Sequence, residues 1–200
     1  MKYIYKVVLA LSAVFFFAQS LAADEQTVLK KHFLTKIDEV ICIVESKKLT
    51  RDQRNGDIVK ALTPMFDFEL MAKLSLGNRW KDLSDAEKEK FVALYVERMK
   101  QSYSSKIDAY KDEKVEIKKA EQTKEDRITL VTDLVSKTQK LEIAYKFHKP
   151  KTPIASKDSW LIYDVEILGV SILKTDIAQF KEFLNTKSIA ELIDVLIKQS

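Results

Sequence analysis

The chain has 200 residues, with 34 Lys and Arg against 30 Asp and Glu, and only one cysteine. The charges are interleaved along every segment, whereas a nucleic-acid-binding protein normally carries a clustered basic face, so the pattern argues against that class. The single Cys42 excludes an intrachain disulfide, and its position in an apolar helical stretch predicts a small core residue.

The first 22 residues have the pattern of a secretory signal peptide. Two lysines precede an apolar run at residues 7–18, and small residues at Ser20 and Ala22 suit cleavage before Ala23. The run is too short to span a bilayer comfortably, although an uncleaved anchor is the alternative. Cleavage removes two lysines and no acid, which lowers the net charge from +4 to +2 and leaves residues 23–200 as one domain.

Helical periodicity dominates the first half of the chain. Apolar residues at spacings of three and four predict an amphipathic helix over residues 24–46. Thr50 and Gln53 have the pattern of a capping box, which predicts a second helix that runs through Leu62 and stops at Pro64.

A short helix and a long one follow. Asp67 is predicted to cap a helix that ends near Gly77, and a second capping box at Ser84 and Glu87 opens the strongest predicted helix, residues 84–110. One stripe of this helix carries Phe91, Tyr95, Met99, Tyr103, Ile107 and Tyr110. Such a stripe is core in most proteins, but it could equally line an apolar cavity.

From about Lys114 the hydrophobic period becomes two. The alternation predicts four strands of an antiparallel meander with one buried face, joined by connections at residues 121–126 and 148–158. The apolar members of the four runs are Val115 and Ile117; Ile128, Leu130 and Leu134; Leu141, Ile143, Tyr145 and Phe147; and Leu161, Tyr163, Val165 and Ile167.

The last strand leads into a turn and two closing helices. Gly169 is predicted to supply a backbone angle that a side chain would oppose, and Ser171 to cap or brace the turn; an ordinary strand end is the alternative. The closing helices carry Ile177, Phe180, Phe183 and Leu184, and then a cap at Ser188 and Glu191 before Leu192. Because helices and strands are segregated, the predicted fold class is α+β.

Catalytic chemistry is sparse. His32 and His148 have no acidic residue at metal-ligand spacing, which predicts surface histidines and no metal site. The chain contains no Gly-rich phosphate loop, no Gly-x-Ser-x-Gly elbow and no Cys-His pair. Asp164, with Tyr163 or Tyr145, is the one candidate for general-base chemistry. Because alternation places Asp164 opposite the apolar face, a solvent-side or turn-pairing role is favoured, and no catalytic residue or cofactor is predicted.

Two blocks of sequence resemble the MlaC family, the periplasmic phospholipid carriers also described as toluene-tolerance proteins. Residues 74–103 are similar to the family's Leu-Gly-x-x-Trp segment and the long helix after it, and residues 186–189 to its closing Thr-Lys-x-Ile segment. The C-terminal signature is matched at Trp160, Asp164, Val165, Gly169, Val170, Ser171, Gln179 and Phe180. The family commonly places an Arg before the end of this signature, where this chain has Ile177 or its neighbours and Lys174 as the nearest cation.

The resemblance implies a cone-like fold similar to the nuclear transport factor two superfamily, with a curved antiparallel sheet of four to five strands. It implies a non-enzymatic periplasmic carrier of the Mla pathway. Phospholipid would be its cargo, passed between an outer-membrane lipoprotein complex and an inner-membrane ABC transporter with a ring-forming lipid-binding subunit. We expect a monomer, because no helix carries a sustained heptad seam. The alternatives are a small-molecule enzyme on the same fold and an interaction module with a filled core.

The apolar pocket expected from this resemblance lies between the long helix and the sheet. Its predicted wall consists of Leu74, Trp80, Phe91, Tyr95, Met99, Tyr103, Leu130, Leu141, Ile143, Tyr145, Val165, Ile167 and Val170.

Overall fold

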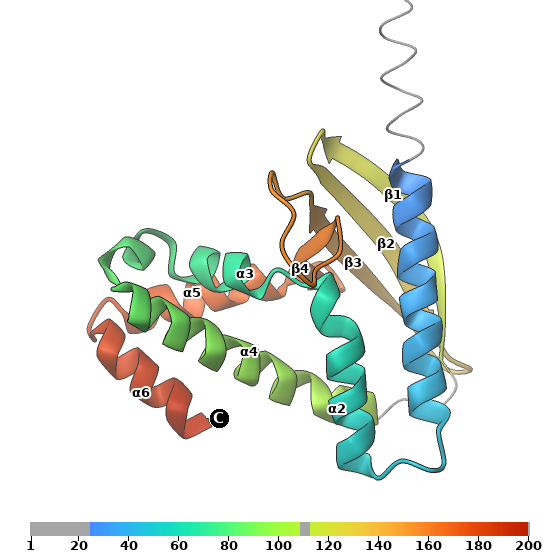
Figure 1. Cartoon of the computed structure of the whole chain (residues 1–200), viewed down its shortest axis with the longest axis horizontal. Helices are drawn as coiled ribbons and strands as arrows, with labels where there is room; N and C mark the ends of the chain where they lie inside the picture. Colours follow the sequence, from blue (N-terminus) through green and yellow to red (C-terminus); the bar gives the residue numbers. More distant parts are fainter. Residues whose placement is uncertain (1–24, 109–112, 200) are drawn as a thin grey trace, which may run out of the picture.

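The computed structural model describes residues 25–108 and 113–199, with only the backbone described at 102–108 and 199 (Figure 1). The predicted signal peptide, residues 1–22, lies outside the described residues. None of the helices in the described ranges combines the length and the hydropathy that crossing a bilayer requires.

The helices begin and end where local capping chemistry places them. The side chain of Thr50 accepts from the backbone N–H of Gln53 at 3.3 Å, and that of Gln53 accepts from the backbone N–H of Thr50 at 2.9 Å. Equivalent boxes at residues 84–87 and 188–191 confirm the other predicted caps. The helices are the N-terminal helix (25–45), α2 (Arg51–Leu62), η1 (Thr63–Met65), α3 (Phe68–Leu76), η2 (Gly77–Asp82), α4 (Asp85–Asp108), α5 (Ile172–Phe183) and α6 (Ile189–Gln199).

The strands form one antiparallel sheet in the order β1-β2-β3-β4-β5, which confirms the predicted α+β class and meander. Leu168 (φ 51°) and Gly169 (φ 78°) make the tight turn that adds the two-residue fifth strand, so the predicted special angle at Gly169 is confirmed. The strands are β1 (Lys114–Lys124), β2 (Arg127–Val135), β3 (Lys140–His148), β4 (Leu161–Ile167) and β5 (Val170–Ser171).

A bulge in β4 breaks the alternation that the sequence suggests. Lys146 pairs with Asp164 and Phe147 pairs with Ile162, so Tyr163 is an extra residue between two consecutive pairs. Ile162 and Val165 therefore point to the inner face of the sheet, while Tyr163 packs against the helices. The prediction that Tyr163 shares a face with Val165 is wrong, because a strict period of two holds only without a bulge.

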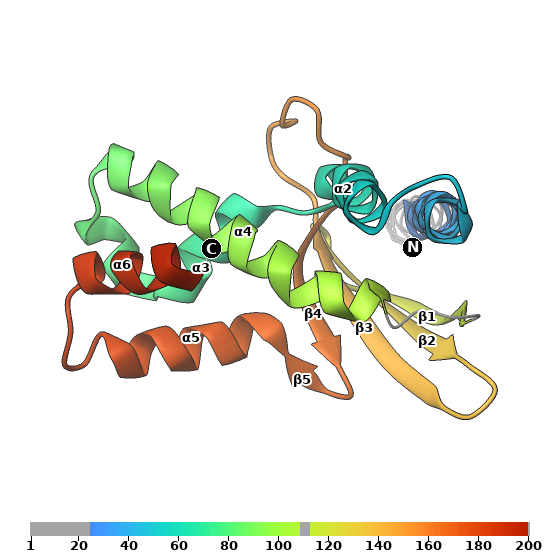
Figure 2. The same cartoon turned by 90° about the horizontal axis from the view of Figure 1, so that it is seen from below.

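The buried side chains form two clusters. The helical core lies among α3, η2, α4, α5 and α6, and the sheet core lies between the N-terminal helix and the inner face of the sheet. Phe66 and Ile172 contact both clusters and so join the two halves. Figures 1 and 2 show this division: the N-terminal helix and α2 stand side by side before the sheet, and α3, α5 and α6 gather beyond β4 and β5.

Cys42 differs from its prediction. It is exposed on the N-terminal helix and forms no disulfide. The apolar stripe of this helix passes through its neighbours Ile41 and Ile43, which are half-buried, and leaves Cys42 on the solvent side. The expectation of a core cysteine was wrong because composition indicates an apolar stretch but not the angle of one residue around the helix axis.

Candidate functional site

The apolar surface between the N-terminal helix and the sheet is buried at one end and partly accessible at the other. On the helix, Leu29 and Phe33 are 3% and 1% exposed, whereas Ile37 and the next turns of the same stripe, through residue 44, are half-buried. Apolar side chains at this spacing share one helix face. The helix therefore presents an apolar stripe that its own packing covers only over its first turns.

The inner face of the sheet changes in the same direction. On β2, Ile128 and Leu130 are buried, whereas Leu134 is half-buried. Its cross-strand partner Leu141, and Ile143 beside it on β3, are also half-buried. We call eight of the half-buried residues of these two facing layers the apolar wall; they are Ile37, Val40, Ile41, Val44, Leu134, Leu141, Ile143 and Ile167.

A pocket of about 340 Å³ lies between the N-terminal helix and α2, which run side by side in Figures 1 and 2. Two lysines and two carboxylates line it together with three apolar residues. The lining residues described are Lys36, Glu39, Ile43, Asp57, Lys60, Ala61 and Pro64. Sequence reasoning missed this pocket, because the two helices contribute its charges from different segments.

The residues predicted from the sequence to line the pocket lie in different parts of the structure. The sheet core contains or contacts Leu130, Ile143, Tyr145, Val165 and Ile167, and Leu141 continues the same face of β3. The helical core contains Trp80, Phe91, Tyr95 and Met99. Leu74 and Val170 are 38% and 63% exposed, and the Tyr103 side chain lies outside the described part of the structure. The described side chains of this set therefore lie in two separate clusters and on the surface.

The stripe of α4 packs among helices. The Phe91 ring contacts the rings of Trp80, Tyr95 and Phe180, with centroids 5.9–6.5 Å apart. The hydroxyl of Tyr95 donates to Asp176 Oδ2 at 2.7 Å, which satisfies its polar end inside the cluster. The sequence left open whether this stripe is packed core or the lining of an apolar cavity. In the structure, this part of α4 is packed core.

Arg98 on α4 supplies a cation beside the C-terminal signature. Its guanidinium forms an ion pair with Asp176 at 2.8 Å and lies 5.5 Å from the centroid of the Phe180 ring, and it donates to Gln179 at 3.3 Å. The sequence placed Lys174 as the nearest cation. No local signal could have identified Arg98, because it lies 81 residues before Gln179 along the chain.

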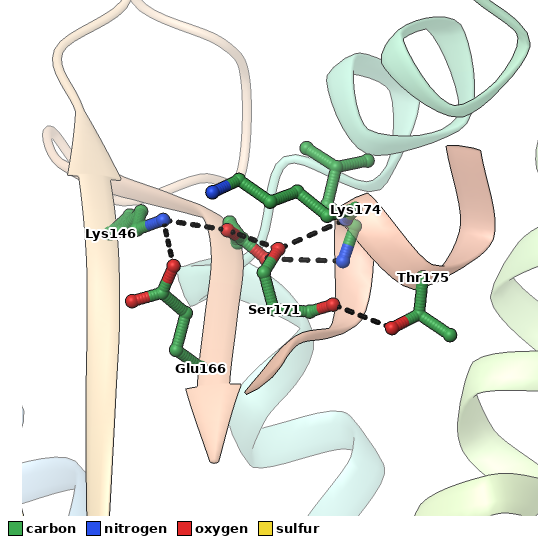
Figure 3. A network of polar contacts seen from close by, with 7 residues as sticks. Lys146, Glu166, Ser171, Lys174 and Thr175 are labelled. Carbon is green, nitrogen blue, oxygen red and sulfur yellow. Dashed lines mark hydrogen bonds and ion pairs between the residues drawn. The ribbon is translucent and has the colours of Figure 1, made fainter. Parts of the chain in front are cut away.

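Asp164 organises the junction of β4 and α5. Figure 3 shows the polar network at this junction, with Lys146, Glu166, Ser171, Lys174 and Thr175 labelled. It is 3% exposed and accepts from the Ser171 hydroxyl at 2.8 Å and from the Leu173 backbone N–H at 3.1 Å. Lys146 Nζ lies 3.1 Å from it and also pairs with Glu166. The predicted turn-pairing role of Asp164 is confirmed, and the predicted solvent-side position is wrong because β5 and α5 cover it.

Ser171 and Lys146 complete this network. The Ser171 hydroxyl accepts from the Lys174 backbone N–H at 2.9 Å, which makes Ser171 the N-cap of α5, as predicted. Burial alone would lower the pKa of Lys146, but its hydrogen bonds to Glu166 and Asp164 raise it above the ordinary lysine value. The charged side chains are thus paired, and they brace the turn.

Two of the candidates for general-base chemistry, Asp164 and Tyr145, do not converge. Lys146 pairs with Asp164 while the neighbouring Tyr145 pairs with Val165, so Asp164 and Tyr145 lie on opposite faces of the sheet. Burial raises the pKa of Tyr145 to about 12, although a hydrogen bond with Thr132 opposes the shift. A phenol with a pKa this high is almost entirely protonated at neutral pH, so it is a poor general base there.

Both histidines pair with distant carboxylates. His148 Nε2 lies 2.8 Å from Asp67 Oδ2 and is 7% exposed, so the prediction of a surface histidine is wrong there. His32 Nε2, which is partly exposed, lies 2.7 Å from Asp158. Within the described ranges, no group of three or more His, Cys, Asp or Glu side chains could hold a metal ion.

Burial opposes ionisation of Asp67, but the hydrogen bonds from His148 and from the Leu70 backbone N–H outweigh it and lower the pKa of this carboxyl. Asp67 also caps α3, as predicted, and its backbone N–H donates to Ile162 of β4 at 2.9 Å. Asp67 therefore connects α3 to the end of β3 through its ionised carboxylate and to β4 through its backbone N–H.

Comparisons with known proteins agree with one another. The family model described as MlaC protein matches residues 35–198. The intermembrane phospholipid transport system binding protein MlaC of Haemophilus influenzae is 25% identical over 133 residues, which cover 66% of this chain and 61% of that protein. The match thus spans less than two thirds of that relative.

Among solved structures, a phospholipid-binding protein from Ralstonia solanacearum, determined in complex with a phospholipid, has a TM-score of 0.71 at 14% identity. The alignment covers 83% of this chain and 93% of that one. At this identity, the likeness shows that the two chains share a fold.

Proposed function

Because the chain belongs to the MlaC family, we propose that it is a periplasmic carrier that moves phospholipid between an outer-membrane complex and an inner-membrane ABC transporter. The observation that carries the proposal is the family match over residues 35–198. The partly accessible apolar wall supports it, because a surface of this kind suits acyl chains.

The free energy of lipid transfer sets what a carrier must do. Each buried methylene contributes about 0.8 kcal/mol, so two chains of about 16 carbons represent roughly 25 kcal/mol of gross transfer free energy. A soluble carrier must therefore shield nearly the whole length of both chains from water. Since a bilayer and an apolar site then have similar free energies, the direction of transfer must come from partners, and ATP hydrolysis belongs to the transporter.

The proposed lipid contacts are the apolar wall and the adjoining sheet core. Among the residues named from the sequence, this set includes Leu130, Leu141, Ile143, Tyr145 and Ile167. The residues of the helical core are assigned a scaffold role, because aromatic neighbours and hydrogen bonds already fill their surroundings. The acyl chains would then lie between the N-terminal helix and the inner face of the sheet.

Two measurements test the carrier function. The protein exported to the periplasm is purified without detergent, extracted with organic solvent and analysed by mass spectrometry; we expect diacyl phospholipid in near-stoichiometric amount. The delipidated protein should then take up labelled phospholipid from liposomes. Protein that carries no lipid and takes none up would contradict the proposal and favour an interaction module with a filled core.

A further inference from the structure

The pocket between the N-terminal helix and α2 has a balanced charge. Lys36 and Glu39 come from the first helix, and Asp57 and Lys60 come from the second. Two cations and two carboxylates give these four side chains a net charge of zero. A ligand that complements them carries one positive and one negative group close together.

Two of these side chains are available for such a ligand. Lys36 Nζ lies 2.9 Å from Glu39 Oε2, so these two are already paired. Among the described residues, the side chains of Asp57 and Lys60 have no hydrogen-bond or ion-pair partner. They stand three positions apart on α2, and residues at this spacing are neighbours on one helix face. A single small zwitterion can therefore contact both.

The pocket also adjoins the apolar wall. Ile43, Ala61 and Pro64 form its apolar lining, and the next residue after Ala61, Leu62, packs against the sheet core. Ile37, which follows Lys36, does the same from the N-terminal helix. Groups attached to a ligand in this pocket would thus reach the proposed acyl-chain site between the N-terminal helix and the inner face of the sheet.

We propose that this pocket holds the head group of phosphatidylethanolamine, an inference that rests on the proposed carrier function. The phosphate lies against Lys60 and Lys36, and the primary ammonium lies against Asp57 and Glu39. A volume of about 340 Å³ is at the lower end of the range for small-molecule pockets, which suits a head group whose chains continue elsewhere.

The lining discriminates among head groups. Choline has no N–H to donate to a carboxylate and is bound by cages of aromatic side chains, whereas none of the described lining residues is aromatic. Phosphatidylglycerol has the same phosphate but no cationic group, so it would leave the carboxylates of the pocket without a partner. Ethanolamine offers a compact ammonium with hydrogen-bond donors, which is the group that Asp57 and Glu39 suit.

The test is a competition for uptake. Delipidated protein is incubated with liposomes of equal ethanolamine, choline and glycerol phospholipids with identical acyl chains, and the bound lipids are quantified by mass spectrometry. We expect ethanolamine lipid to be enriched over glycerol lipid by about two- to fivefold, the range that partly exposed ion pairs supply. Asp57→Lys should remove or reverse this enrichment, and Asp57→Asn, which preserves side-chain size, should remove it.

Asp38→Lys is the matched control, because Asp38 is exposed on the N-terminal helix outside the pocket lining and the variant has the same net charge as Asp57→Lys. It should keep the enrichment. Lipid bound in the liposome ratio, or an equal effect of Asp38→Lys, would overturn the head-group site while the carrier function stands. Failure to bind any phospholipid would overturn both proposals. Micromolar binding of soluble glycerophosphoethanolamine without lipid uptake would assign the pocket to a free metabolite.

Discussion

Asp164 and Ser171 are joined by a buried hydrogen bond of 2.8 Å in which the serine hydroxyl donates to the carboxylate. The same hydroxyl accepts from the backbone N–H of Lys174, so one side chain connects Asp164 of β4 to the first turn of α5. The bond also explains why the signature places an acid and a serine seven residues apart: the tight turn brings these two positions together.

The first prediction is that Ser171→Ala destabilises the protein by about 1–3 kcal/mol. The substitution removes the N-cap of α5, which costs about 1 kcal/mol, and takes a donor from a buried carboxylate, which adds a desolvation cost. Urea unfolding measures the difference, and Ser159→Ala, at an exposed position, is the control. Equal midpoints for the two variants would show that the bond has no role in stability.

A second prediction concerns Gly169, whose φ of 78° a side chain resists. A Cβ at this position would meet no atom within 4 Å, so the cost is backbone strain of about 1–2 kcal/mol and not a clash. Gly169→Ala should lower the melting temperature, and Gly169→Val should do so further and reduce bound lipid by displacing the end of β4.

Gly56 provides the matched comparison. It lies in α2 and has no positive φ, and a Cβ added there would also meet no atom within 4 Å. Gly56→Ala should raise stability by about 0.5–1 kcal/mol, because alanine favours a helix interior. If both alanine variants shifted the melting temperature in the same direction, strain at Gly169 would be the wrong explanation.

Local features of this fold could be predicted from sequence, because the interacting groups lie within a few residues. The capping box of Thr50 and Gln53 is one example, and the turn at Gly169 is another. The pairing of His148 with Asp67 was not predictable, since 81 residues separate the two and neither segment signals the other. Long-range register decides such contacts.

The candidate site shows the same limit. Alternation correctly placed Ile143 on the inner face of the sheet, but the helical period of α4 could not say which neighbour its stripe would meet. It meets α5 and α6. The bulge at Tyr163 is a further example, because one extra residue changes which side chains share a face and no single residue type announces it.

The third prediction is a pH dependence centred on Asp67. The folded-state pKa of Asp67 is lowered from an ordinary value of 3.8, so ionised Asp67 stabilises the fold above that value. This contribution is lost as the pH falls through the lower folded-state pKa. Asp67→Asn should therefore destabilise the protein at pH 6 and make progressively less difference below about pH 4.

Urea unfolding at several pH values measures this trend. Asp38→Asn, at an exposed position, is the control and should change stability little at any pH. A destabilisation by Asp67→Asn that stays constant from pH 6 to pH 3 would mean that the carboxylate charge is unimportant and that only the shape of the cap matters.

The last prediction separates the apolar wall from the helical core. Ile143 is half-buried on the inner face of β3, whereas Met99 is 3% exposed and surrounded by the helical core. Overpacking a filled core typically costs 1–3 kcal/mol, so Met99→Trp should lower stability by about that amount. Ile143→Trp should occupy space proposed for acyl chains, and it should reduce bound phospholipid strongly while changing stability by less than about 1 kcal/mol. Lipid mass spectrometry and urea unfolding on the same samples give both quantities. If Met99→Trp removed the lipid and Ile143→Trp left it in place, the acyl chains would lie among the helices, and the assignment of the wall to the N-terminal helix and the sheet would be wrong.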